Sequence, residues 1–122
     1  MLAALRTTLS HSAPFAAGVA LYPGCQSDLD IRFYAPLMVL IGRADTVTPA
    51  TYCETMKAGQ SGNGGSKLEL VVYPRALHTF DMPLADRTVL GMRLGYDPEA
   101  AADARRRVPD FFAATLLTGR LR

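Results

Sequence analysis

Residues 36–49 read Pro36-Leu-Met-Val-Leu-Ile-Gly-Arg-Ala-Asp-Thr-Val-Thr-Pro49, and this stretch decides the fold. Its first half is a short apolar run, which is typical of a strand that is buried on both faces of a sheet. Asp45 follows directly after that strand. Thr48 and Pro49 then give an N-cap and first-turn signal for a helix of about ten residues. The stretch therefore predicts a buried strand that carries an aspartate just past its C-terminal end.

Two more apolar runs predict further strands. Residues 15–22 form a nearly continuous apolar segment that ends at Pro23-Gly24, and residues 68–73 form another that ends at Pro74. The predicted helix after Pro49 separates the second strand from the third. Because strands and helices alternate, we expect an α/β domain with about three parallel strands and helices on both faces.

Helical patterns lie at both ends of the chain. Residues 2–9 have leucines at helical spacing, and Asp97-Pro98 is a start signal for a helix over residues 98 to about 117. Pro109 is expected to kink or interrupt that helix. Between them, residues 79–96 are expected to be irregular, with a short helical piece near 84–90. The face of the last helix that should pack on the sheet consists of Ala101, Ala104, Val108, Phe111, Phe112 and Thr115.

Length and composition describe one globular domain spanning residues 1–122. Hydrophobic residues make up 49% of the chain, charged residues make up 20%, and the net charge is only +2. The short basic run at residues 105–107 is typical of a solvated helix face, so we expect no nucleic-acid partner. No apolar run approaches the roughly 20 residues of a membrane span, and the first residues do not form a signal peptide. These features predict a cytoplasmic protein with no membrane partner.

The cysteines and histidines do not form a metal pattern. The chain has two of each, Cys25, Cys53, His11 and His78, without the spacing of a ligand set. Two cysteines also make no disulfide framework, so reduced thiols are expected. Cys53 should be buried within the helix that follows Pro49 and should contribute to core packing.

A histidine follows the third predicted strand, as the aspartate follows the second. His78 lies in the segment His78-Thr-Phe-Asp81, a few residues beyond Pro74. Two strands that deliver an aspartate and then a histidine match the order in which α/β-hydrolases carry the last two members of their catalytic triad. The third member has no counterpart, because the 122 residues contain no Gly-x-Ser-x-Gly or Gly-x-Cys-x-Gly elbow.

Several segments together resemble the dienelactone hydrolase family of α/β-hydrolases. The resemblance covers about residues 2–117, which correspond to the C-terminal half of a typical member, and it implies a partial α/β-hydrolase fold without the nucleophile-bearing half. Residue by residue, it implies Asp45 as the triad acid and His78 as the triad base. It further implies acyl transfer on small carboxylic esters or lactones, with no cofactor and no metal. The matching segments are Tyr22–Cys25, Pro36–Pro49, Tyr52-Cys53, Leu70–Pro74, His78–Asp81 and Arg93–Pro98.

The nucleophile is left open by the sequence. Cys25 is the best internal candidate, because it follows the first strand at the sheet edge where Asp45 and His78 should emerge, and thiols are good nucleophiles. Against it, its position in the resembling segment is structural, and no helix N-terminus follows it to activate the sulfur. Ser10, Ser12 and Ser27 are weaker candidates. Otherwise the nucleophile comes from elsewhere, in a longer protein or another chain.

A second class of function also fits the sequence. The chain could be a catalytically inactive α/β-hydrolase remnant that serves as an oligomerising or binding domain. In the family, the strand at residues 15–22 would pair with the strand that carries the nucleophile, and without that neighbour its edge is open. We therefore expect a homo-oligomer that forms through this edge.

Overall fold

The computed structural model describes residues 15–28, 33, 35–60 and 68–120, with only the backbone described at 27–28 and 118–120. The helix predicted over residues 2–9 and nearly all of the loop predicted at 60–66 lie outside these residues. The described elements are β1 (Gly18–Leu21), a 3₁₀ turn η2 (Cys25–Asp28), β2 (Leu37–Gly42), α1 (Ala50–Gln60), β3 (Leu68–Tyr73), β4 (Arg87–Val89), β5 (Met92–Leu94) and α2 (Pro98–Arg120).

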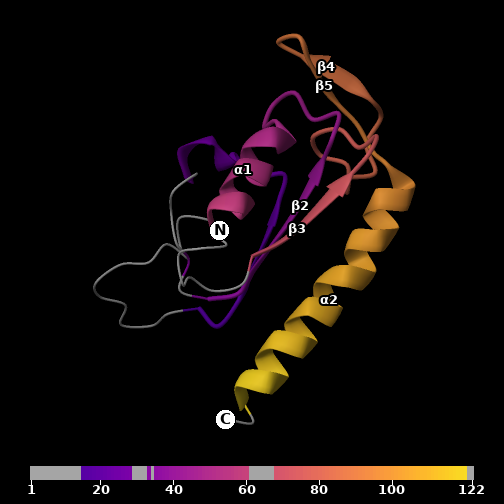
Figure 1. Cartoon of the computed structure of the whole chain (residues 1–122). Coiled ribbons are helices and arrows are strands. Elements are labelled where there is room, and N and C mark those ends of the chain that lie inside the picture. The colour runs from indigo at the N-terminus through magenta and orange to yellow at the C-terminus, as the bar shows by residue number, and fades with distance from the viewer. Residues whose placement is uncertain (1–14, 29–32, 34, 61–67, 121–122) are drawn as a thin grey trace.

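The first three strands form one parallel sheet in the order β1-β2-β3 (Figure 1). The central strand, β2, is buried along its whole length. Its side chains alternate between two cores because successive residues of a strand face opposite sides. Leu37, Val39 and Ile41 pack in the core that holds Cys53 and Met56 of α1, whereas Met38 and Leu40 pack in the core that holds residues of α2. This arrangement confirms the predicted α/β fold with three parallel strands.

The last helix, α2, begins at Pro98, as the start signal Asp97-Pro98 predicts. The Asp97 carboxylate accepts hydrogen bonds from the amides of Glu99 and Ala100, both at 3.1 Å, which satisfies two of the free donors at the helix start. The predicted interruption at Pro109 is wrong, because α2 continues through it to Arg120. Pro109 and Arg105 both lie on the exposed side. Proline has no amide hydrogen, so the carbonyl of Arg105, four residues earlier, lacks its helical partner. This carbonyl is on the exposed side, and the hydrogen bonds on the sheet-facing side of the helix stay intact.

A hairpin replaces the helical piece that the sequence predicts near residues 84–90. β4 and β5 pair antiparallel, and their turn places both Leu90 and Gly91 at positive φ, +52° and +80°. That conformation is typical of a two-residue hairpin turn, which usually carries asparagine or glycine at its first position. The sequence did not predict the hairpin, because this position is occupied by Leu90 and not by asparagine or glycine.

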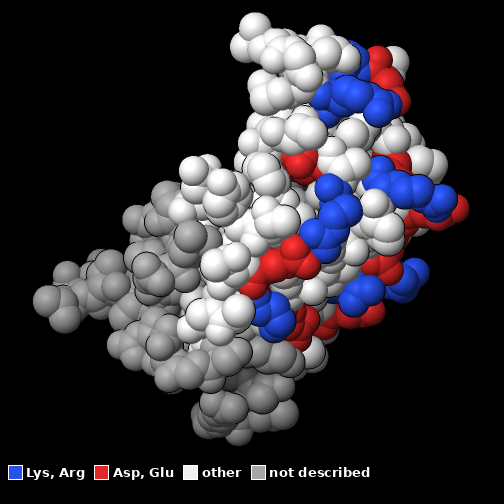
Figure 2. Space-filling model, turned by 45° about the horizontal axis from the view of Figure 1, so that its top comes forward, with Lys and Arg blue, Asp and Glu red and all other residues white. Residues whose placement is uncertain are grey.

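Charges of both signs are interleaved on the face that Figure 2 shows, where basic and acidic side chains alternate over short distances. On α2, Arg106 and Arg107 of the basic run at residues 105–107 both pair with Asp103. Among the described helices, none combines the length and the apolar character needed to cross a bilayer.

Gly42, the last residue of β2, packs closely against the segment that follows β3. A Cβ atom at this position would lie 2.0 Å from the carbonyl oxygen of Ala76 and 2.4 Å from its carbonyl carbon. Because these are backbone atoms, a side chain here must force the two segments apart. We expect Gly42→Ala to lower the free energy of unfolding by about 1–3 kcal/mol, measured by urea denaturation.

Gly24→Ala is the matched control for that substitution. Its added methyl would meet only Thr48 Cγ2, at an ordinary 3.7 Å, so we expect a change within about 0.5 kcal/mol. Equal losses of stability in the two variants would show that the contact with Ala76 is not the cause.

Candidate active site

Asp45 lies in the turn that follows β2, and its side chain is fully buried. The turn is fixed by the backbone, since the Ala44 amide donates to Ala76 O at 3.1 Å. One carboxylate oxygen, Oδ1, accepts hydrogen bonds from the amides of Val47 and Thr48, both at 2.8 Å. An aspartate that binds amides two and three residues ahead stabilises its own turn. The carboxylate is therefore held in one orientation, with Oδ2 directed to the opposite side.

His78 meets that second oxygen. Its Nδ1 lies 2.8 Å from Asp45 Oδ2, and its side chain is 18% exposed. An ionised carboxylate only accepts hydrogen bonds, so Nδ1 must carry the hydrogen and donate it. In the neutral ring, Nε2 is then the lone-pair nitrogen. The structure thus brings together the two residues that the sequence singles out, in the geometry that a general base requires.

Thr48 completes the surroundings of the carboxylate. Its hydroxyl oxygen lies 3.0 Å from Asp45 Oδ2, 3.1 Å from Tyr22 O and 3.3 Å from His78 Nδ1. The sequence predicts Thr48 as an N-cap, but α1 begins at Ala50 and the hydroxyl is directed into the site instead. The spacing between the two residues could have indicated this contact, because the hydroxyl of a threonine three residues after an aspartate can reach the carboxylate of that aspartate.

Tyr22 also lies at the site, although the sequence indicates no role for it there. It follows β1 with φ +40°, a conformation that costs a residue with a side chain on the order of 1–3 kcal/mol. Its hydroxyl donates to Asp81 Oδ1 at 2.9 Å. Burial, and then this hydrogen bond, raise the pKa of Tyr22 to about 12. The hydroxyl therefore remains protonated, and remains a donor, at neutral pH.

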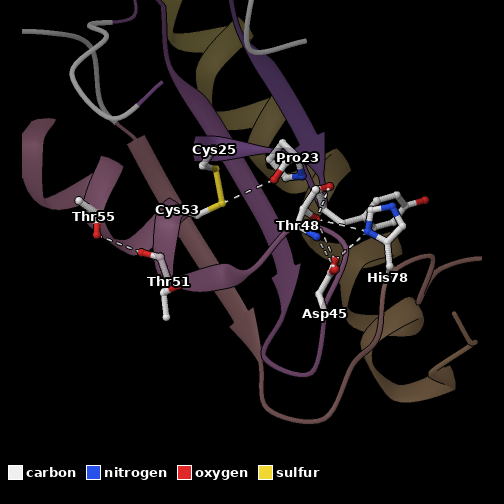
Figure 3. The surroundings of a disulfide bond; sticks show 9 residues. Pro23, Cys25, Asp45, Thr48, Thr51, Cys53, Thr55 and His78 are labelled. Atoms are coloured by element: carbon white, nitrogen blue, oxygen red, sulfur yellow. Dashed lines mark hydrogen bonds and ion pairs between the residues drawn. A yellow bond between two sulfur atoms is a disulfide. The ribbon is translucent and has the colours of Figure 1, made fainter. Parts of the chain in front are cut away.

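The two cysteines form a disulfide, so the expectation of reduced thiols is wrong for this structure (Figure 3). Their Cα atoms are 5.0 Å apart, and both residues are buried. The sequence did not predict this pairing, because the two cysteines are 28 positions apart and come into contact only when η2 packs on α1. Cys53 Sγ also lies 3.8 Å from Pro23 O. This is a contact and not a hydrogen bond, because a disulfide sulfur carries no hydrogen.

The prediction of Cys25 as a possible nucleophile is wrong for this structure, because Cys25 is in the disulfide. A sulfur that is already bonded to Cys53 is not a thiolate, and the thiolate is the reactive form. The burial of Cys53 itself agrees with the prediction for that residue. No serine replaces Cys25 in this role among the described side chains, because the side chain of every serine lies outside them. The serines are Ser10, Ser12, Ser27, Ser61 and Ser66.

Within the described residues, no three side chains of histidine, cysteine, aspartate or glutamate gather as a metal site would require. His11 lies outside those residues. The described part of the candidate site consists of Asp45 and His78, with Thr48 and Tyr22 in contact with them. What it can do chemically is accept a proton at Nε2 and stabilise the resulting imidazolium against a buried carboxylate.

Two comparisons with known proteins give matches. The family model described as "Dienelactone hydrolase family" matches residues 2–116. A protein from Yersinia pestis named "Putative carboxymethylenebutenolidase" is 33% identical over 115 residues, which cover 84% of this chain and 39% of that protein. The chain thus spans about two fifths of the length of this relative. No solved structure gives a significant match.

Proposed function

Because this chain belongs to the dienelactone hydrolase family, we propose that it hydrolyses small carboxylic esters or lactones with Asp45 and His78 as its acid–base pair. The observation that supports this proposal most strongly is the 2.8 Å contact between His78 Nδ1 and the buried Asp45 carboxylate. A carboxylate in this position holds the imidazole tautomer and stabilises the cation that forms when Nε2 accepts a proton.

In the proposed reaction, Nε2 of His78 removes the proton of a nucleophilic hydroxyl or thiol as that atom attacks the ester carbonyl carbon. The proton then passes from His78 to the leaving alcohol oxygen, which leaves an acyl intermediate on the nucleophile. Water repeats the sequence and releases the acid. Cys25 is not this nucleophile, because its sulfur is bonded to Cys53. We assign the role to a residue outside the described part of the chain.

We infer the substrate class of this chain from the name of the Yersinia pestis relative. That name describes an enzyme acting on carboxymethylenebutenolide, which is an unsaturated lactone. The test measures hydrolysis of p-nitrophenyl acetate and of carboxymethylenebutenolide by the purified chain. Hydrolysis of both, with the lactone at the higher kcat/KM, is the expected result. Hydrolysis of the acetate alone would contradict the lactone proposal, and no hydrolysis of either would contradict the proposed function.

We also propose that the chain forms a homo-dimer through β1. Among the described strands, β1 pairs with β2 alone, and such an edge is a template for pairing with another chain. The Gly18 amide donates to the carbonyl of Pro36, directly before β2, at 3.0 Å, and the Tyr22 amide donates to the carbonyl of Leu40 in β2 at 2.7 Å. Because successive amides point to opposite sides of a strand, the Leu21 amide points away from β2.

Leu21→Pro tests the dimer, because it removes that outward amide and spares the donors that face β2. We expect size-exclusion chromatography with light scattering to give a dimer for the natural chain at micromolar concentration and a monomer for Leu21→Pro. Circular dichroism of the variant checks that the fold is kept. A well-folded monomer of the natural chain at the same concentration would rule out the proposal.

A further inference from the structure

Tyr22 links the three segments that build the site. Its backbone carbonyl lies 3.1 Å from the hydroxyl of Thr48, in the segment that carries Asp45. Its own hydroxyl donates at 2.9 Å to Asp81, which lies three residues beyond His78. Its amide donates to Leu40 O of β2 at 2.7 Å. A single residue at the end of β1 therefore joins the acid segment, the base segment and the central strand.

The ring of Tyr22 also packs against the imidazole itself. The ring centroids of Tyr22 and His78 are 4.5 Å apart, with an angle of 57° between the ring planes. Phe80 supports the tyrosine from another direction, with its ring edge-on at 5.7 Å. An imidazole that is hydrogen-bonded through Nδ1 alone can still tilt about that bond, and an aromatic wall on one side limits this motion.

Both segments that meet here have unfavourable backbone conformations. Tyr22 has φ +40° and Thr79, which directly follows His78, has φ +65°. A β-branched residue at positive φ is an outlier that persists only where the surrounding contacts hold it. The hydrogen bond from Tyr22 to Asp81 closes the segment around Thr79 and is placed to hold it in this conformation.

We propose that Tyr22 is a positioning residue that orients the imidazole of His78 for proton transfer. Its ring limits the tilt of the imidazole, and its hydroxyl fixes the segment that carries it. This proposal rests on the proposed function for its effect on rate. The orientation of His78 can be measured without any substrate, so the two claims are tested separately.

The variants separate the ring of Tyr22 from its hydroxyl. Tyr22→Phe keeps the ring and removes the donor to Asp81, whereas Tyr22→Leu removes both. Tyr73→Phe is the matched control, because Tyr73 is likewise partly buried and its hydroxyl donates to a carboxylate, that of Asp103, at 2.6 Å. A general loss of stability on removing such a hydrogen bond would appear in Tyr22→Phe and Tyr73→Phe alike.

The first readout is the NMR spectrum of the histidine rings. The chain has only two histidines, His11 and His78, so His11→Gln assigns the signals. Tyr22→Leu is expected to shift the His78 ring signals and to speed exchange of its Nδ1 hydrogen with water. Tyr73→Phe is expected to leave both unchanged. Unchanged His78 signals in Tyr22→Leu would overturn the proposal.

The second readout is the split between kcat and KM for p-nitrophenyl acetate. Misplacing a catalytic group by about 1 Å can cost up to roughly 100-fold in rate. We expect kcat to fall about 10- to 100-fold in Tyr22→Leu and less in Tyr22→Phe, with KM changed by less than about twofold. A kcat for Tyr22→Leu equal to that of Tyr73→Phe would overturn the positioning role. If the natural chain hydrolyses no ester, the proposed function fails, and the histidine signals still decide the role of Tyr22.

Discussion

Replacing Asp45 by asparagine is expected to lower ester hydrolysis by about 10²- to 10⁴-fold. The buried carboxylate accepts two backbone amides on Oδ1 and faces Thr48 and His78 on Oδ2. An asparagine side chain has only one acceptor oxygen, so its NH₂ group must face donors on one of the two sides. If that group faces His78, Nδ1 must become the acceptor and the proton moves to Nε2. The ring then lacks a lone pair where the reaction needs one.

The same substitution is expected to destabilise the fold by about 1–3 kcal/mol, because buried donors lose their acceptor. Urea denaturation therefore accompanies the rate measurement, and rates are taken where the variant is fully folded. Asp86→Asn is the control, since Asp86 is exposed and its nearest basic partner, Arg93, is 3.9 Å away. We expect that variant to keep both rate and stability. A fully folded Asp45→Asn chain with the natural rate would show that Asp45 is not part of the catalytic pair.

Reducing the disulfide is expected to cause the largest loss of stability. Cys25 and Cys53 close a loop across a sequence separation of 28 residues. The loop-closure relation assigns about 3–4 kcal/mol to a loop of that length at 25 °C. For a chain of this size, that loss corresponds to a fall in Tm of roughly 10–20 °C. The bond also joins the segment after Tyr22 to α1, which follows Thr48, so reduction should loosen both supports of His78.

Thermal unfolding with and without dithiothreitol measures this effect. The double variant Cys25→Ala/Cys53→Ala is the control, because its Tm should not respond to the reductant. We expect the natural chain after reduction to unfold at about the temperature of the double variant or slightly above it, since both lack the cross-link. Equal Tm values for the natural chain with and without reductant, where thiol titration confirms full reduction, would contradict a stabilising role.

The sheet and its flanking helices could be predicted from local sequence. The apolar run before Gly42 has no polar position to place on a solvated face, so only a strand covered on both sides accommodates it. The cap at Asp97 likewise acts through neighbouring residues, and its hydrogen bonds form as predicted. Two features that sequence reasoning missed depend on contacts between distant residues or on unusual backbone angles. They are the disulfide, whose cysteines are 28 positions apart, and the turn at Leu90-Gly91.

Half of the candidate site could be predicted in the same way. Asp45 and His78 each follow a parallel strand, and the ends of neighbouring parallel strands lie at one edge of the sheet. Their 2.8 Å contact is thus a consequence of topology that the order of strands already implies. Tyr22 gave no such signal, because its ring reaches His78 only through the strained turn after β1. The nucleophile stays a prediction, because no described side chain carries it.

The most direct test of the central claim compares His78→Ala with His11→Ala in the hydrolysis of p-nitrophenyl acetate. The two variants each remove one of the two imidazoles of the chain, so they separate site-specific catalysis from the general reaction of an imidazole with an activated ester. Our account predicts that His78→Ala falls to the rate of buffer alone while His11→Ala keeps the natural rate. Equal rates in the natural chain and in both variants would contradict the assignment of Asp45 and His78 as a working acid–base pair.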